Sequence, residues 1–112
     1  LGKQANCQAG VFLGYSSAAG YTLLDKRLYL PAEWFNATYA AKRYKCHVPT
    51  DLTFQTKNAL AWSMIEAVAQ AGTLAARWLT MDEAFGKDTH LLERICCQRQ
   101  LHLDINDNYI YP

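Results

Sequence analysis

The stretch "TKNALAWSMIEAVAQAG", Thr56 to Gly72, decides the fold because it carries the longest regular apolar pattern in the chain. Its apolar residues recur at helical spacing and form one stripe, which comprises Leu60, Met64, Ala67, Val68 and Ala71, widened by Ala61 and Ile65. Thr56 is a residue type that caps helix starts, and Gly72 is one that ends helices in a left-handed conformation. The pattern therefore predicts a helix with one face on a core.

Two strands are predicted upstream of this helix. "CQAGVFLGYSS", Cys7 to Ser17, and "GYTLLDKRLYLP", Gly20 to Pro31, are short apolar runs, and "SSAAG" between them is typical of a hairpin turn. The charged trio Asp25, Lys26 and Arg27 indicates that the second strand has one face in water. From Pro31 to Asp51 the pattern is mixed, and we expect a surface excursion. Pro31 suits the first position of a short helix there, and "TYAAKRYK" a further helical turn or two.

Downstream, "LAARWLTM", Leu74 to Met81, predicts a short strand, and "DTHLLERI", Asp88 to Ile95, predicts a second helix. "LHLDI", Leu101 to Ile105, favours a further strand. The order strand, strand, excursion, helix, strand, helix indicates an α/β fold with a mixed sheet and flanking helices. The three tryptophans are expected in core or half-buried packing: Trp34, Trp62 and Trp78.

Bulk composition fits one small folded domain. The chain has 112 residues, of which 51% are hydrophobic and 19% charged, which argues against disorder. The net charge of +1 does not by itself predict binding to nucleic acid or acidic lipid. No apolar run approaches the length of a membrane span and the first residues do not resemble a signal peptide, so we expect no membrane partner and a cytoplasmic location.

The cysteines are better interpreted as reduced thiols than as a zinc site, since only Cys96 and Cys97 are close, and these are adjacent.

Asp82 is the strongest candidate for chemistry because it directly follows a predicted strand. In open α/β sheets, sites gather at the carboxyl ends of strands, and a carboxylate there suits Mg²⁺ or Mn²⁺. The other interpretation, which spacing alone favours, is a capping or turn aspartate. Two-metal phosphoryl chemistry needs several converging carboxylates, and neither Glu83 nor Asp88 is placed by spacing to join Asp82.

A small basic cluster, Lys42, Arg43 and Lys45, is interleaved with Tyr39 and Tyr44. The simpler interpretation of this cluster is a solvated helix face without a binding role. The more specific interpretation is contact with a DNA backbone.

Several segments, read in order, resemble the DDE-type transposases of bacterial insertion sequences. "LGKQANCQAGVFLGYSS" is similar to the segment after the family's first catalytic aspartate, and "YLPAEWF" with "VPTDLTFQTKNALAWSMIEAVAQAG" is similar to its excursion and long helix. "RWLTMDEAFGKD" resembles the strand that carries the second catalytic aspartate. The resemblance runs from Leu1 to about Ile95, and it implies a partial ribonuclease-H-like fold for residues 1–95, with residues 96–112 as a divergent tail.

The resemblance also implies a function. In this family, two aspartates and a glutamate hold two divalent ions that cleave DNA at the element ends and join it to target DNA. Only Asp82 falls on one of these positions, as catalytic residue and metal ligand; the first aspartate is expected before Leu1 and the glutamate beyond Pro112. The chain is thus expected to be a transposase fragment that is inactive alone and binds no metal tightly. The alternative is a non-catalytic module that binds DNA, or that associates with itself or an intact transposase through an open sheet edge.

Overall fold

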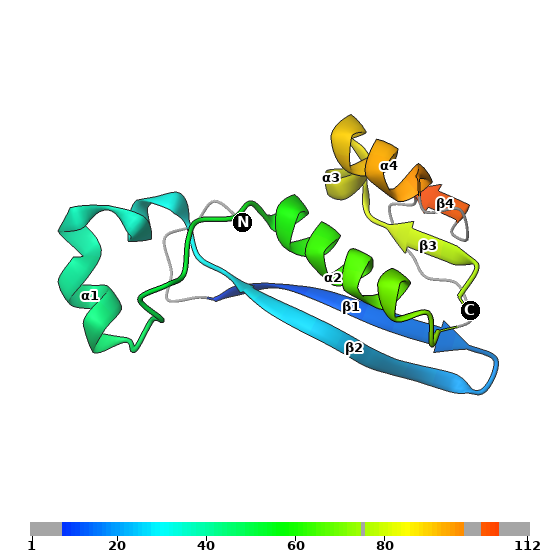
Figure 1. Cartoon of the computed structure of the whole chain (residues 1–112), viewed down its shortest axis with the longest axis horizontal. Coiled ribbons are helices and arrows are strands. Elements are labelled where there is room, and N and C mark those ends of the chain that lie inside the picture. Colours follow the sequence, from blue (N-terminus) through cyan, green and yellow to red (C-terminus); the bar gives the residue numbers. More distant parts are fainter. Residues whose placement is uncertain (1–7, 75, 98–101, 106–112) are drawn as a thin grey trace.

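The first two strands form a long antiparallel hairpin. β1 (Ala9–Ser17) pairs with β2 (Gly20–Tyr29) in the computed structural model, which describes residues 8–74, 76–97 and 102–105 (Figure 1). Ser17 and Gly20 are paired across the turn, where Gly20 has φ 144°, a conformation that glycine adopts readily. The predicted hairpin is confirmed, although β2 ends at Tyr29 and Cys7 lies outside the described residues.

The excursion after the hairpin is made of short helical turns at one end of the molecule (Figure 1). These are η1 (Ala32–Phe35), η2 (Ala37–Tyr39) and α1 (Ala40–Lys45), and Pro31 precedes η1 as its N-cap. Two hydrogen bonds close α1: His47 N donates to the Tyr44 carbonyl, and Val48 N to that of Arg43. His47 adopts φ 56° at the position where helices commonly end in a left-handed residue.

The predicted long helix is α2 (Lys57–Ala71), and both predicted ends are confirmed. Thr56 Oγ1 accepts a hydrogen bond from Ala59 N at 3.1 Å, and Gly72 has φ 64°. The buried residues of α2 are Leu60, Met64 and Ile65, whereas Ala67, predicted in the stripe, is exposed. The buried part of the predicted stripe contacts two neighbours: the hairpin through Leu60 and Met64, and α4 through Ile65.

The second half of the chain alternates strands and helices. β3 (Trp78–Met81) leads into the single turn α3 (Glu83–Gly86), then α4 (Thr89–Cys96) and β4 (His102–Ile105), and β4 pairs with β3 in parallel. β3 begins four residues later than predicted, because Ala76 and Arg77 lack the β-branched or aromatic side chains that favour strands. Trp34 and Trp62 are half-buried, as predicted, whereas Trp78 is 61% exposed, so the prediction of core or half-buried packing was wrong for Trp78.

Two small apolar clusters form the core on either side of α2. The hairpin side contains Val11, Leu60 and Met64. The other side contains Ile65, Leu91 and Ile95, with Leu79 and Met81 of β3 packed against it. The described strands form two separate two-stranded sheets, one antiparallel and one parallel, with helices against them (Figure 1). This mixed α/β arrangement is consistent with a partial ribonuclease-H-like fold, as predicted.

Candidate functional site

Asp82 lies at the junction between β3 and α3. It is the N-cap of α3, and its Oδ1 accepts a hydrogen bond from Phe85 N at 3.2 Å. The side chain is exposed, and no hydrogen bond or ion pair to its second oxygen is found within the described residues. Asp82 therefore does cap a helix, as spacing alone favoured, and its second carboxylate oxygen has no partner within the described residues.

Asp82 also borders a groove of about 230 Å³ between the hairpin and β3. The lining residues come from β1, α2, β3, the β3–α3 junction, α3 and α4: Val11, Phe12, Leu13, Ala61, Met64, Ile65, Leu79, Thr80, Met81, Asp82, Phe85 and Leu91. Asp82 is the one ionisable residue in this lining, and its neighbours are almost all apolar. A carboxylate at the mouth of an apolar groove, at the carboxyl end of a strand, is where α/β folds commonly place a ligand site.

Comparison with known proteins identifies the family. A family model described as DDE superfamily endonuclease matches residues 1–104. The chain belongs to this family. The resemblance to DDE-type transposases noted in the sequence is thereby supported, and no curated protein and no solved structure gave a match.

DDE endonucleases generally use divalent metal ions. Within residues 8–74, 76–97 and 102–105, no group of three or more His, Cys, Asp or Glu side chains is placed to hold a metal ion. Asp82 fits as one oxygen ligand, but one carboxylate does not hold two ions. The described part of this DDE endonuclease chain thus contains no complete metal site.

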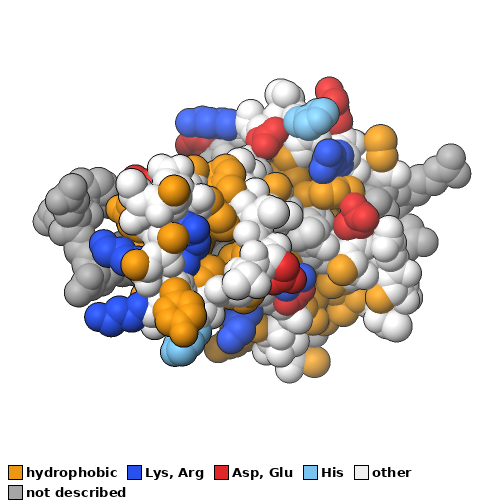
Figure 2. Space-filling view, turned by 60° about the vertical axis from the view of Figure 1, so that its left-hand side comes forward, with side chains coloured by type: hydrophobic (Ala, Val, Ile, Leu, Met, Phe, Trp, Pro, Cys, Tyr) orange, Lys and Arg blue, Asp and Glu red, His pale blue; other side chains and the backbone are white. Residues whose placement is uncertain are grey.

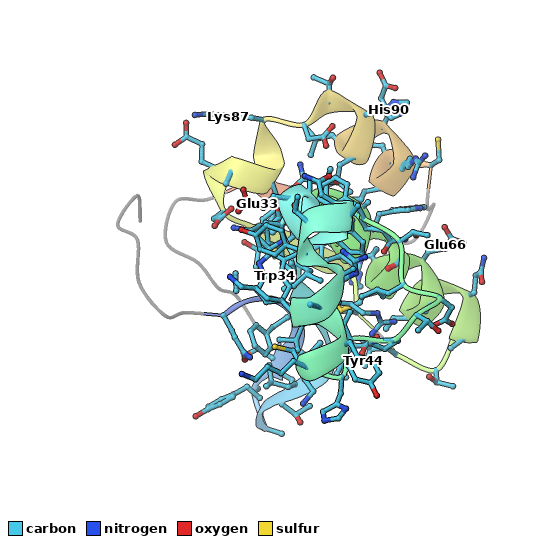
Figure 3. The ribbon with its side chains drawn as sticks, turned by 90° about the vertical axis from the view of Figure 1, so that its left-hand side faces the viewer. Glu33, Trp34, Tyr44, Glu66, Lys87 and His90 are labelled. Carbon is cyan, nitrogen blue, oxygen red and sulfur yellow. The ribbon has the colours of Figure 1, made fainter. Side chains whose placement is uncertain are left out.

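Glu83 and Asp88, the acidic residues closest to Asp82 in the sequence, both bond to other groups. The Glu83 carboxylate pairs with Lys87 Nζ at 2.9 Å on the exposed side of α3, and Figure 3 shows Lys87 extending outward. Asp88 caps α4, with Oδ1 accepting from His90 N and Leu91 N and Oδ2 accepting from Asn58 Nδ2 at 2.8 Å. The hydrogen bond from Asn58, followed by that from Leu91 N, lowers the pKa of Asp88 below its ordinary value.

The basic cluster lies on α1, at one end of the molecule and away from β3 and α3 (Figure 1). Arg43 is turned inward: its Nη1 donates to the carbonyl oxygens of Trp34 and Asn36, so it holds the excursion together. Lys42 and Lys45 are exposed, and Lys42 Nζ lies 5.1 Å from the centre of the Tyr39 ring. The three residues therefore divide into one structural arginine and two accessible lysines.

Tyr44 adds an exposed ring to the same helix. Its side chain is 86% exposed and extends from the end of the molecule that faces the viewer in Figure 3. Figure 2 shows Lys and Arg side chains gathered with apolar ones on this end.

Of the four cysteines, Cys46, Cys96 and Cys97 are exposed free thiols, and Cys7 lies outside the described residues.

Two features were not predicted from the sequence: the groove beside Asp82 and the hydrogen bond from Asn58 to Asp88. Phe12 and Thr80 are 68 positions apart, and nothing in their local sequences indicates that they line one cavity. The bond from Asn58 to Asp88 likewise joins residues 30 positions apart. The local pattern left Asp88 or Thr89 as the cap of this helix, and only the packing of α2 beside α4 brings Asn58 within reach of Asp88.

Proposed function

We propose that this chain is part of the catalytic domain of an insertion-sequence transposase, a nuclease that cleaves DNA and transfers strands in DNA transposition. Membership in the DDE endonuclease family supports the nuclease chemistry, and the order of the segments in the sequence supports a transposase. The observation that carries the proposal is Asp82, an exposed carboxylate at the carboxyl end of β3 with one oxygen uncommitted within the described residues.

Asp82 is the proposed metal ligand of the domain. Carboxylate oxygens suit Mg²⁺ or Mn²⁺, and a divalent ion supplies charge stabilisation to the phosphodiester when bound. The bond from Phe85 N fixes the side chain of Asp82 at the groove mouth without using its second oxygen. Because the described residues offer one such carboxylate, we expect the isolated chain neither to cleave DNA nor to bind Mg²⁺ tightly.

The experiment is an alanine substitution at the position of Asp82 in a full-length relative of the family. The expected result is loss of transposition and of DNA-end cleavage, while the fold and DNA binding are retained. Glu83→Ala is the matched control, because this neighbouring carboxylate is exposed and paired with Lys87. Unchanged transposition in the Asp82 variant would overturn its assignment as ligand, whereas an equal loss in both variants would indicate a general effect of the turn.

A second candidate function is non-catalytic binding of DNA through α1. The supporting observation is the exposed pair Lys42 and Lys45, with the exposed ring of Tyr44 on the same short helix. Lysines bind phosphates, and aromatic rings stack on unpaired bases, so this end of the molecule suits contact with a DNA backbone or single strand. Arg43 would support DNA binding in two ways: it stabilises the excursion that carries the lysines, and it adds a positive charge.

Binding to a short DNA duplex at two or more salt concentrations tests this candidate. We expect Lys42→Gln with Lys45→Gln to weaken binding and to flatten its salt dependence by about two released counterions, since each phosphate contact contributes about one. The matched control is Lys87→Gln with Arg94→Gln, on α3 and α4. Salt-independent binding, no binding at low salt, or equal loss in both double variants would exclude α1 as the contact.

A further inference from the structure

Phe85 connects the core of the molecule to Asp82, and we infer that it is a positioning residue for the Asp82 carboxylate. The inference rests on the proposed function of Asp82, and it concerns how this side chain is held. Phe85 N donates to Asp82 Oδ1 at 3.2 Å. Gly86 N donates to the Asp82 carbonyl at 3.0 Å, so the backbone of α3 meets Asp82 at two points. The orientation of the carboxylate therefore depends on where the turn of α3 is held.

The ring of Phe85 holds this turn on the core. α3 is a single turn of four residues, none of them fully buried, and so short a helix has little stability of its own. Glu83 and Ala84 are exposed, whereas Phe85 is half-buried. Its side chain packs against both apolar clusters, the one that contains Leu60 and the one that contains Ile65. The position of α3 thus comes mainly from the packing of this ring.

The far end of the turn is held separately. The Phe85 carbonyl accepts a hydrogen bond from Asp88 N at 3.1 Å, and the Asp88 carboxylate accepts one from Asn58 Nδ2 of α2 at 2.8 Å. Because the bond between Asn58 and Asp88 does not involve the ring of Phe85, α4 should stay attached to α2 when the ring is removed. We therefore expect truncation of the ring to release the near end of the turn, where Asp82 lies, and to leave α4 in place.

The test measures the orientation of the carboxylate in the full chain, without metal or DNA. Three-bond NMR couplings across the Cα–Cβ bond of Asp82 report the populations of its side-chain rotamers. We expect one dominant rotamer in the wild-type chain and couplings averaged over several rotamers in Phe85→Ala. Phe85→Tyr keeps the ring and should restore the wild-type couplings.

Leu60→Ala is the matched control. Leu60 is buried in one of the clusters that Phe85 packs against, but it does not line the groove beside Asp82. Both alanine variants remove apolar packing from the core and are expected to destabilise the chain. A residue with a packing role alone changes stability without changing the rotamer of Asp82, so we expect wild-type couplings in Leu60→Ala.

Metal dependence in a full-length relative with an aromatic residue at the position of Phe85 gives a second measurement. Alanine there should raise the Mg²⁺ concentration for half-maximal DNA cleavage by about three- to tenfold, because the carboxylate must then be ordered as it binds. Cleavage at saturating Mg²⁺ should stay within about threefold of wild type. The opposite split, an unaltered half-saturation concentration with a lower saturated rate, is expected of a residue that only stabilises the fold, and it would overturn the inference.

Three results of the NMR measurement would also overturn it: averaged Asp82 couplings in the wild-type chain, wild-type couplings in Phe85→Ala, or equal averaging in Leu60→Ala. If Phe85→Ala does not fold, Phe85→Leu takes its place, and wild-type couplings there would be equally decisive. Failure of the proposed function is recognised separately. Near-normal cleavage by Asp82→Asn in the relative would remove the metal role of Asp82, whereas the couplings in this chain do not depend on that role.

Discussion

Two aspartates begin neighbouring helices in this molecule and are treated very differently by their surroundings. Asp82 accepts one hydrogen bond, from Phe85 N, and its side chain is exposed. Asp88 accepts three, from His90 N, Leu91 N and Asn58 Nδ2, and these use both of its oxygens. Asp88 is therefore committed to joining α4 to α2, while Asp82 retains an oxygen for a further partner.

This difference separates stability from function at two residues of the same type. A carboxylate with both oxygens bonded within the protein stabilises the fold but has little capacity left for a metal ion. A carboxylate fixed by a single backbone N–H is oriented and still available. Capping and metal binding are thus not exclusive alternatives for Asp82, and each of the following variants separates them.

The largest expected effect is on catalysis in a full-length relative carrying Asp82→Asn. Asparagine caps helices about as well as aspartate, so the turn at α3 should persist while the charge is lost. Because a metal ion supplies several kcal/mol of transition-state stabilisation, we expect DNA cleavage to fall by roughly a thousandfold. Asp88→Asn is the comparison, and cleavage there should change less than about tenfold. Near-normal cleavage with Asp82→Asn would leave that residue with its capping role alone.

The second effect is on folding, where substitution of Asp88 is expected to matter more than substitution of Asp82. Asp88→Ala removes three hydrogen bonds and leaves the Asn58 amide without its acceptor, so we expect the melting temperature of the chain to fall by several degrees. Thermal unfolding followed by circular dichroism provides the measurement, with Asn58→Ala as the partner variant. The double variant should lose less than the sum of the two single losses, and strict additivity would argue against the bond.

The contrast also marks how far sequence reasoning reaches. Local rules predicted the long helix with its caps, the hairpin, a cap or turn role for Asp82 and a helix start at Asp88 or Thr89, because these depend on residues within a few positions of each other. They also predicted the three buried residues of α2, Leu60, Met64 and Ile65, but they placed Ala67 in the same stripe, and Ala67 is exposed. They did not reveal the groove, because residues from Val11 to Leu91 meet there only after packing. The assignment of Asp82 to metal stays a prediction.

A third effect is a pH dependence of stability that belongs to Asp88. Its pKa is lowered in the folded chain from an ordinary 3.8, chiefly by the Asn58 hydrogen bond, so the folded state holds the proton less strongly than the unfolded state. The resulting stabilisation is complete above the unfolded pKa and is lost as the pH falls through the folded pKa. We expect the melting-temperature difference between wild type and Asp88→Asn to be largest near neutral pH and to shrink below about pH 4. A difference that stays constant down to pH 2 would contradict this linkage.

The smallest expected effect is the cost of Asp82→Ala to the fold. This variant removes one hydrogen bond from the single turn of α3, whose backbone is largely at the surface, so we expect a loss of about 0.5–1 kcal/mol in the free energy of unfolding. Urea unfolding of the chain gives the value, and Asp82→Asn should recover most of it. A small cost together with a large catalytic loss in the relative would mean that the carboxylate is retained for a ligand. A cost well above 2 kcal/mol would mean instead that the cap organises the whole β3–α4 connection, and the catalytic loss would then have a structural explanation.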